Sequence, residues 1–342
     1  MSFPAYYHQI ALPNSQSDVY TTYTAVIMAT SNLSLKSMLS KERVQHVRWI
    51  AISSSTQEPQ NPIWRGHLCQ WYFHALESIE RFDGNRGAFP RSVAHVAMKI
   101  LDMFLCSRSM DVQLLARVDE RVYKPVAWAC LYNAMRRCSI DRAAADPHLK
   151  TAPPSHVETD GGDVTGITVN GRHFTETAFL QMCHGSNLTT PDEFASLVAS
   201  ISSFLDSFEC FNDTLPLTAS HVSQVFGRMI RQQFSQETHP FEDATFLQKL
   251  EACMDETVSN SRFARYPPSL NSAAAILVAM PDSIDRTVLL HLLTQYRMSG
   301  GYALSTLRNV VEELRLEMDE RAPLEEREVR DDNREVVHII PS

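Results

Sequence analysis

The stretch Lys124–Arg136 reads KPVAWACLYNAMR, and it limits how the rest of the chain can be arranged. In a helix, its apolar residues would occupy two faces, one with Val126, Ala129, Cys130 and Ala134 and another with Trp128, Leu131 and Met135. A helix that is apolar on most sides must be surrounded by other helices. The stretch therefore predicts a buried helix at the centre of a helical domain.

A second stretch of the same kind occurs much later in the chain. Leu270–Met280 reads LNSAAAILVAM, and both segments end in Ala-Met when it is aligned with PVAWACLYNAM. Leu131 then corresponds to Ile276. Two buried, alanine-rich helices in one chain indicate a single helical unit that is used twice.

Length and charge narrow the class of protein. At 342 residues, of which 44% are hydrophobic, the chain is long enough for two domains with real cores. The net charge is −9, with 31 Lys and Arg against 40 Asp and Glu. A protein that binds phosphate backbones needs a basic surface, so no nucleic-acid partner is expected.

Cysteine usage and hydropathy indicate an intracellular, soluble protein. The seven cysteines are scattered, with no CxxC pair, which is typical of a reduced compartment rather than of a disulfide framework. The N-terminus lacks the basic and apolar regions of a signal peptide. No apolar run reaches membrane-spanning length, so no membrane partner is expected.

The beginning of the chain is predicted to be an irregular extension. Residues 1–40 are rich in Ser, Thr, Tyr and Asn and have no sustained period. Val44, Val47 and Ile50 then recur at about helical spacing, which predicts a helix over residues 40–50.

Two amphipathic helices are predicted ahead of the buried one. They cover Leu68–Ile79 and Val93–Leu105, where apolar residues recur at i, i+3, i+4 and i+7. Beyond the buried helix, Cys138–Arg172 loses all periodicity and is rich in Pro and Gly. We interpret it as an exposed insertion, with one possible short strand near Ile167–Val169.

The second half of the chain is predicted to be helical. Thr190, Pro191 and Glu193 form a helix start signal, because Thr caps, Pro suits the first helical position and Glu completes a capping box. Helices are expected at Phe174–Cys183, from Pro191 onward, and at Ala219–Phe234, Glu242–Val258, Leu270–Met280, Ser283–Arg297 and Tyr302–Asp319. The fold class is therefore all-α, with a charged tail from Glu320 that cannot bury a core.

Several segments resemble the cyclin family. WRGHLCQWYFHAL (Trp64–Leu76), SVAHVAMKILDMFL (Ser92–Leu105) and PVAWACLYNAMR (Pro125–Arg136) resemble the first three helices of a first cyclin box. RYPPSL (Arg265–Leu270) and the alanines after it resemble the Tyr-Pro-Ser-x-x-Ala-Ala motif that opens the third helix of a second box. The resemblance covers about residues 60–318.

The resemblance implies two tandem five-helix cyclin-box bundles in an all-α fold. It places an irregular N-terminal extension at residues 1–59 and the N-terminal box at 60–210, with the insertion at about 138–172. The C-terminal box follows at 216–319, and a charged tail at 320–342.

A cyclin-like chain is expected to be a regulatory subunit that binds and activates a cyclin-dependent Ser/Thr protein kinase and so controls cell-cycle progression. Binding would select the kinase conformation in which the catalytic ion pair is assembled. The resemblance implies no catalytic residues and no cofactor in the subunit itself, and a location in the nucleus and cytoplasm.

The resemblance also assigns roles to single residues. Arg65 and Asp102 match two family residues that pair and tie the first helix to the second. Lys124 and Arg136 are expected on the kinase-binding side, and Arg136 stands where the family has a Lys. Ile201 aligns with the Glu that partners this Lys, and this departure favours binding without kinase activation.

A second family feature is a shallow apolar patch that recruits Arg-x-Leu substrates or inhibitors. Here it would consist of Trp64, His67, Leu68 and Trp71. His67 replaces an aliphatic residue and makes the patch more polar. The alternative interpretation is that these residues only pack at the start of a helix.

No catalytic or metal-binding motif accompanies these features. The histidines lack HExxH and Cys-His spacings, and His184-Gly185-Ser186 lacks the GxSxG frame, so no enzyme and no metal are expected. Two alternatives to a kinase regulator stay open. One is a cyclin-fold scaffold or adaptor without kinase activation, and the other is a DNA-binding protein similar to transcription factor IIB, against which the acidic charge counts.

Overall fold

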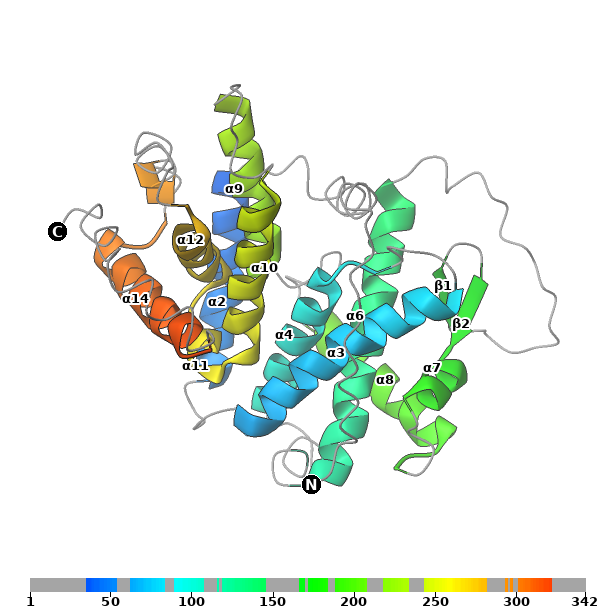
Figure 1. The fold of residues 1–342 in the computed structure, drawn as a ribbon. Helices are drawn as coiled ribbons and strands as arrows, with labels where there is room; N and C mark the ends of the chain where they lie inside the picture. Colours follow the sequence, from blue (N-terminus) through cyan, green and yellow to red (C-terminus); the bar gives the residue numbers. More distant parts are fainter. Residues whose placement is uncertain are drawn as a thin grey trace.

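The chain is largely helical wherever its structure is described (Figure 1), so the all-α prediction is confirmed at the level of fold class. A computed structural model describes residues 35–53, 62–83, 89–107, 116, 119–145, 166–169, 172–183, 188–207, 218–233, 243–281, 293–294, 296–297 and 301–321. Most of the predicted N-terminal extension, most of the predicted helix over 283–297, and the tail beyond 321 lie outside these residues.

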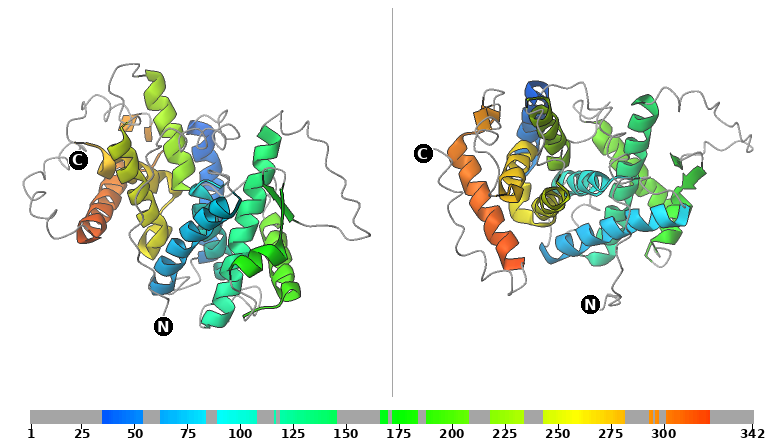
Figure 2. Two further views of the ribbon diagram at one scale, coloured as in Figure 1. Left: turned by 45° about the vertical axis from the view of Figure 1, so that its right-hand side comes forward. Right: turned by 45° about the horizontal axis from the view of Figure 1, so that its top comes forward.

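The helices form two groups, each with its own apolar core (Figures 1 and 2). The first group consists of α3 (Pro62–Asp83), α4 (Ser92–Ser107), α6 (Glu120–Ala145), α7 (Glu176–Met182) and α8 (Pro191–Asp206). The second consists of α9 (Ala219–Gln233), α10 (Ala244–Ser259), α11 (Ser261–Ala264), α12 (Pro268–Ala279) and α14 (Leu304–Arg321), together with α2 (Leu35–Ser53).

The helix α6 is the centre of the first core. Every residue from Val126 to Met135 is buried, and α4 and α8 pack against it. The Asn133 side-chain amide donates to the Ala129 carbonyl at 3.0 Å and to the Val198 carbonyl of α8 at 3.1 Å. The predicted buried helix is confirmed, because apolar side chains on several faces find neighbours on several sides.

The helix α12 has the same position in the second core. Every residue from Ser269 to Met280 is buried, and α9, α10 and α14 surround the helix. Its alanines let these neighbours approach closely, and each large apolar side chain that they bury contributes roughly 1.5–3 kcal/mol. The buried helix predicted over Leu270–Met280 is therefore confirmed, and it starts two residues earlier, at Pro268.

The helix α2 lies on the second core, although it precedes the first core in the sequence. Its buried apolar residues are Leu35, Met38 and Leu39. The helix predicted over 40–50 is thus confirmed and longer than expected, but its expected apolar face is wrong for Val44, which is 50% exposed. The side chains of Val47 and Ile50 lie outside the described residues. The irregular extension predicted for residues 1–59 therefore contains at least this helix.

The predicted insertion is also corrected. The helix α6 continues to Ala145, and Cys138 is buried at 5% exposure. The missing apolar stripe in SIDRAAA hid this helix, although Ala and Arg favour helices at any position. Strands β1 (Gly166–Val169) and β2 (Arg172–Thr175) form an antiparallel hairpin, with Ile167 opposite Phe174. The short strand predicted near Ile167–Val169 is therefore confirmed.

The hairpin also shortens the helix predicted at 174–183. The chain is still extended at Phe174, and α7 begins only at Glu176, because the Thr175 hydroxyl accepts the backbone N–H of Ala178. The start of α8 follows the prediction: Thr190 accepts from the Glu193 N–H at 3.3 Å, and the Glu193 carboxylate accepts from the Thr190 N–H at 2.8 Å. This reciprocal pair is a capping box.

Candidate functional site

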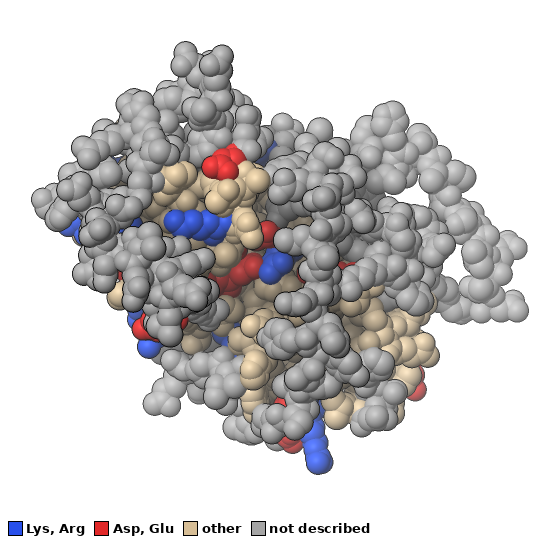
Figure 3. Space-filling model, in the orientation of Figure 1, with Lys and Arg blue, Asp and Glu red and all other residues tan. Residues whose placement is uncertain are grey.

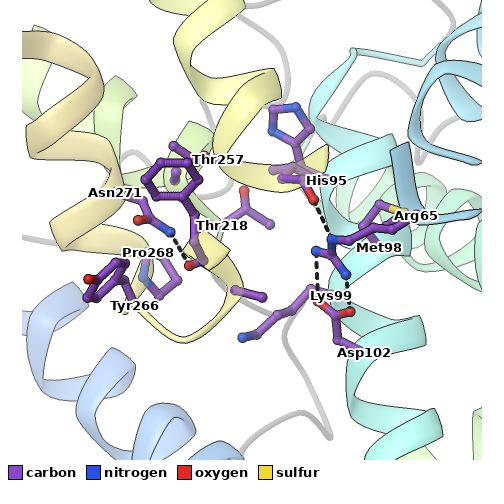
Figure 4. A pocket seen from close by; sticks show the side chains of 14 residues that line it. Arg65, His95, Met98, Lys99, Asp102, Thr218, Thr257, Tyr266, Pro268 and Asn271 are labelled. Carbon is purple, nitrogen blue, oxygen red and sulfur yellow. Dashed lines mark hydrogen bonds and ion pairs between the residues drawn. The ribbon is translucent and has the colours of Figure 1, made fainter. Parts of the chain in front are cut away.

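A fully buried ion pair joins the first two helices of the first core (Figure 4). The Arg65 guanidinium on α3 donates from both Nη atoms to the carboxylate of Asp102 on α4, with 3.0 Å between Nη2 and Oδ2. Burial opposes the charge of Arg65, but the Asp102 carboxylate outweighs it, and the pKa of Arg65 is raised. The structure thus brings these two predicted residues together as a charged, bidentate pair that fixes α3 against α4.

The same guanidinium reaches into the second core. Arg65 Nε donates to the Val258 carbonyl at 2.9 Å, in the last turn of α10. Carbonyls at the end of a helix lack intrahelical partners, so Arg65 acts as a cap for α10. The Val258 side chain also packs against the first core. One arginine therefore connects three helices across the junction of the two cores.

A second set of polar contacts holds α4 to α10. Asp255 accepts from Arg91 Nε at 2.8 Å through Oδ2, and its Oδ1 lies 2.9 Å from His95 Nε2. The Arg91 guanidinium also lies 3.9 Å from the centre of the Phe73 ring. Figure 3 shows one face of the molecule, and acidic and basic side chains lie next to each other near its middle. The junction between the cores is thus positioned by directional charged contacts, which limit sliding of α10 along α4.

A small cavity opens between these contacts (Figure 4). Lys99, Thr218, Thr257 and Asn271 supply its polar lining, together with Arg65 and Asp102. Its volume is about 50 Å³, well below the roughly 300 Å³ at which small-molecule pockets begin. The cavity has room for a few water molecules among these polar side chains.

The predicted docking patch is mostly part of the first core. Leu68 is only 7% exposed, and the rings of Trp64 and Trp71 are partly buried beside α6. Trp64 packs on Tyr123 with 5.3 Å between ring centroids, and Trp71 lies 6.1 Å from Trp128. His67 is exposed. The four predicted residues do lie on one face of α3, but this geometry favours the interpretation that they pack at the helix start.

The predicted kinase-facing residues are separate from one another. Lys124 and Arg136 lie twelve residues apart on α6, about 18 Å along its axis at 1.5 Å per residue. The Lys124 ammonium lies 2.8 Å from the carboxylate of Glu120. Arg136 is half-buried beside Glu176, where burial raises the pKa of the Glu176 carboxyl and the charge of Arg136 lowers it. Any partner that contacts both cations must therefore cover much of α6.

Ile201 has a different position from the one its alignment implied. Its side chain is completely buried in the first core. It therefore presents no surface to a partner, and its assignment as a kinase-contacting position is not compatible with this burial. The apolar residue is explained by packing alone.

Sequence reasoning missed Lys99 and Asp255, which lie at the junction, and Glu42, which lies between α2 and α12. The hydrogen-bond partners of Glu42 and Asp255 are distant in sequence, so no local pattern identifies these two residues. Only Glu42 left a signal, because it continues the apolar stripe of Leu35, Met38 and Leu39 at helical spacing. A carboxylate on such a stripe indicates a buried charge with a tertiary partner.

Possible metal ligands among the described residues do not cluster. No three His, Cys, Asp or Glu side chains converge on a possible metal position in this part of the chain. Its six cysteines are buried, and burial raises the pKa of the Cys69 thiol to about 12, which suppresses the reactive thiolate. No described helix is both long and apolar enough to cross a membrane. No protein-family model and no curated protein matches the chain.

Proposed function

We propose that the chain is a cyclin-like regulatory subunit that binds and activates a cyclin-dependent Ser/Thr protein kinase in the nucleus and cytoplasm. The observation that carries the proposal is the repeated plan of two helical cores around the buried, alanine-rich helices α6 and α12. The bidentate pair of Arg65 and Asp102, at the positions where the cyclin resemblance expects it, adds support.

In this proposal the two cyclin boxes span residues 60–210 and 216–319, and the subunit carries out no chemistry. It would stabilise one conformation of the kinase through contacts that the other conformation lacks. Arg136 and Lys124 on α6 would lie on the kinase side. A guanidinium at position 136 can bind a carboxylate with two parallel hydrogen bonds, which an ammonium cannot do.

A second candidate is a cyclin-fold scaffold that binds protein partners without activating a kinase. The specific observation in its favour is that Ile201, one of the residues expected on the kinase-binding side, is buried and offers a partner no surface. The packing of Leu68 into the core also weakens the proposed recruitment of Arg-x-Leu substrates.

The deciding experiment is an affinity capture of partners from the native cell extract with the full chain. Bound proteins are identified by mass spectrometry and assayed for histone kinase activity. A captured cyclin-dependent kinase with activity above control supports the regulatory subunit. A captured kinase without activity, or no kinase where an ordinary cyclin captures one, supports the scaffold.

The interface is then tested by charge reversal. Arg136→Glu is expected to reduce kinase capture at least tenfold, because it places like charge against the partner's carboxylates. Arg297→Glu, at an exposed position in the second half of the chain, is the matched control and is expected to leave capture unchanged. Equal capture by both variants would contradict the placement of the interface on α6.

A further inference from the structure

The helix α2 is attached to the second core through a buried carboxylate. Glu42 is 2% exposed. One of its oxygens accepts the backbone N–H of Ser269, and the other lies 2.6 Å from the Ser269 hydroxyl. Ser269 lies in the first turn of α12, where backbone N–H groups have no intrahelical acceptor. Pro267, at the N-cap of α12, supplies no side-chain cap, so Glu42 supplies it from another helix.

The charged and titratable groups that act on Glu42 come from several elements. Lys99 on α4 and Arg43 on α2 provide positive charge. The phenols of Tyr296 and Tyr302 also act on the carboxyl, and burial raises the pKa of both phenols, so they stay neutral near pH 7. The start of α12 adds the positive end of a helix dipole.

We propose that α2 is a reversible clasp whose docking on the second core is controlled by protonation of Glu42. The clasp is α2 with its three buried apolar residues, Leu35, Met38 and Leu39. A neutral carboxyl keeps both contacts with Ser269, because carboxyl and hydroxyl can each donate or accept. A carboxylate keeps them as well but must lose its hydration to do so. The inference does not depend on the proposed function.

The direction of the effect follows from the balance of these terms. Burial has the largest effect on the pKa of Glu42 and raises it. The hydrogen bonds from Ser269 and the charges of Lys99 and Arg43 lower it, and together these effects raise the pKa of Glu42 from 4.5 to about 7. The docked state therefore binds the proton more tightly than the released state. Its extra stability is complete below pH 4.5 and is lost as the pH rises through 7. Between pH 6 and pH 8, the equilibrium constant for release of α2 increases about tenfold.

Amide hydrogen exchange of the full chain, followed by mass spectrometry, tests this inference. Peptides that cover α2 are compared at pH 6 and pH 8 after division by the intrinsic exchange rate at each pH. The expected result is a roughly tenfold loss of protection in α2, with a smaller change in peptides from α6. Unchanged protection in α2, or an equal loss in every peptide, would overturn the proposal.

Two variants identify the proton-binding group. Glu42→Gln offers Ser269 the same acceptor and donor without a charge, so α2 is expected to stay protected at both pH values. Glu312→Gln, at a half-exposed carboxylate on α14, is the matched control and is expected to keep the wild-type pH dependence. If Glu42→Gln retained the full pH dependence, Glu42 would not be the controlling group. If that variant failed to fold, unchanged protection of α2 in the wild type between the two pH values would still overturn the proposal.

Discussion

Asp102 and Glu42 are both carboxylates withdrawn from water, and each connects two helices. Asp102 receives two charged hydrogen bonds from Arg65. Glu42 receives its hydrogen bonds from the backbone and hydroxyl of Ser269, while the cations that act on it are not its hydrogen-bond donors. The comparison teaches that two buried acids can be held by different kinds of donor. The donors at Asp102 carry a positive charge, whereas those at Glu42 are neutral and can bond to either form of the carboxyl.

The two sites are therefore expected to respond differently to loss of charge. At the Arg65 site, a single substitution strands a charge in an apolar region. At the Glu42 site, a neutral isostere preserves the contacts and removes a desolvation cost. Stability measurements on matched variants can separate these two behaviours.

The largest effect is expected for Arg65→Met. This change leaves the Asp102 carboxylate buried without its partner, which costs about 3–5 kcal/mol of unfolding free energy. The double variant Arg65→Met, Asp102→Leu is expected to recover most of that loss, since it removes both charges. Urea unfolding followed by circular dichroism measures both. A double variant no more stable than the single one would show that packing, not charge, is the main contribution of Arg65.

A smaller and pH-dependent effect is expected for Glu42→Gln. Burial raises the pKa of Glu42 to about 7. The wild type therefore has the full stabilisation from the protonated carboxyl below pH 4.5 and loses this stabilisation as the pH rises through 7. Relative to the wild type, the variant should therefore become more stable by about 1 kcal/mol between pH 6 and pH 8. Urea unfolding of both proteins at the two pH values provides the difference. A constant difference would mean that Glu42 does not titrate in this range.

The smallest effect is expected for Lys124→Ala, which removes the partly exposed pair with Glu120 on α6. Such i,i+4 pairs contribute about 0.3–0.5 kcal/mol, and salt screens them. The loss should therefore shrink in 1 M NaCl, whereas the loss in Arg65→Met should persist. Thermal unfolding of the Lys124→Ala and Arg65→Met variants, at low salt and in 1 M NaCl, measures both losses. A large, salt-independent loss in Lys124→Ala would place this pair among the buried ones.

The sequence predicted those parts of the fold in which local pattern and tertiary environment agree. The stretch around Trp128, the alanines of α12 and the capping box at Thr190 belong to this class, because periodicity and hydrogen-bonding chemistry act within a few residues. The buried face of α2 could not be predicted in this way. Val44 continues a plausible apolar period, yet the core lies on the side of Leu35 and Met38.

The candidate site was predictable to a similar extent. The pair of Arg65 and Asp102 was expected from a family resemblance, and the structure brings the two residues together. Val258, the third partner of Arg65, contributes a backbone carbonyl, and any residue could provide that group. The alignment of Ile201 with a family Glu crosses the Pro- and Gly-rich segment at 138–172, where the sequence has no period to fix the register. The burial of Ile201 in the first core shows that this side chain contributes to packing.

The docking of α2 on the second core also has a consequence for synthesis of the chain. Glu42 and Ser269 are 227 positions apart, so a ribosome that adds about 5–20 residues per second needs roughly 10–45 s to pass from one to the other. During that interval Leu35, Met38 and Leu39 have been made, but Ser269 and the rest of α12 have not. The contacts of α2 with α12 must therefore form late in folding, and until then the surface that α12 will cover is available to chaperones or to another nascent chain.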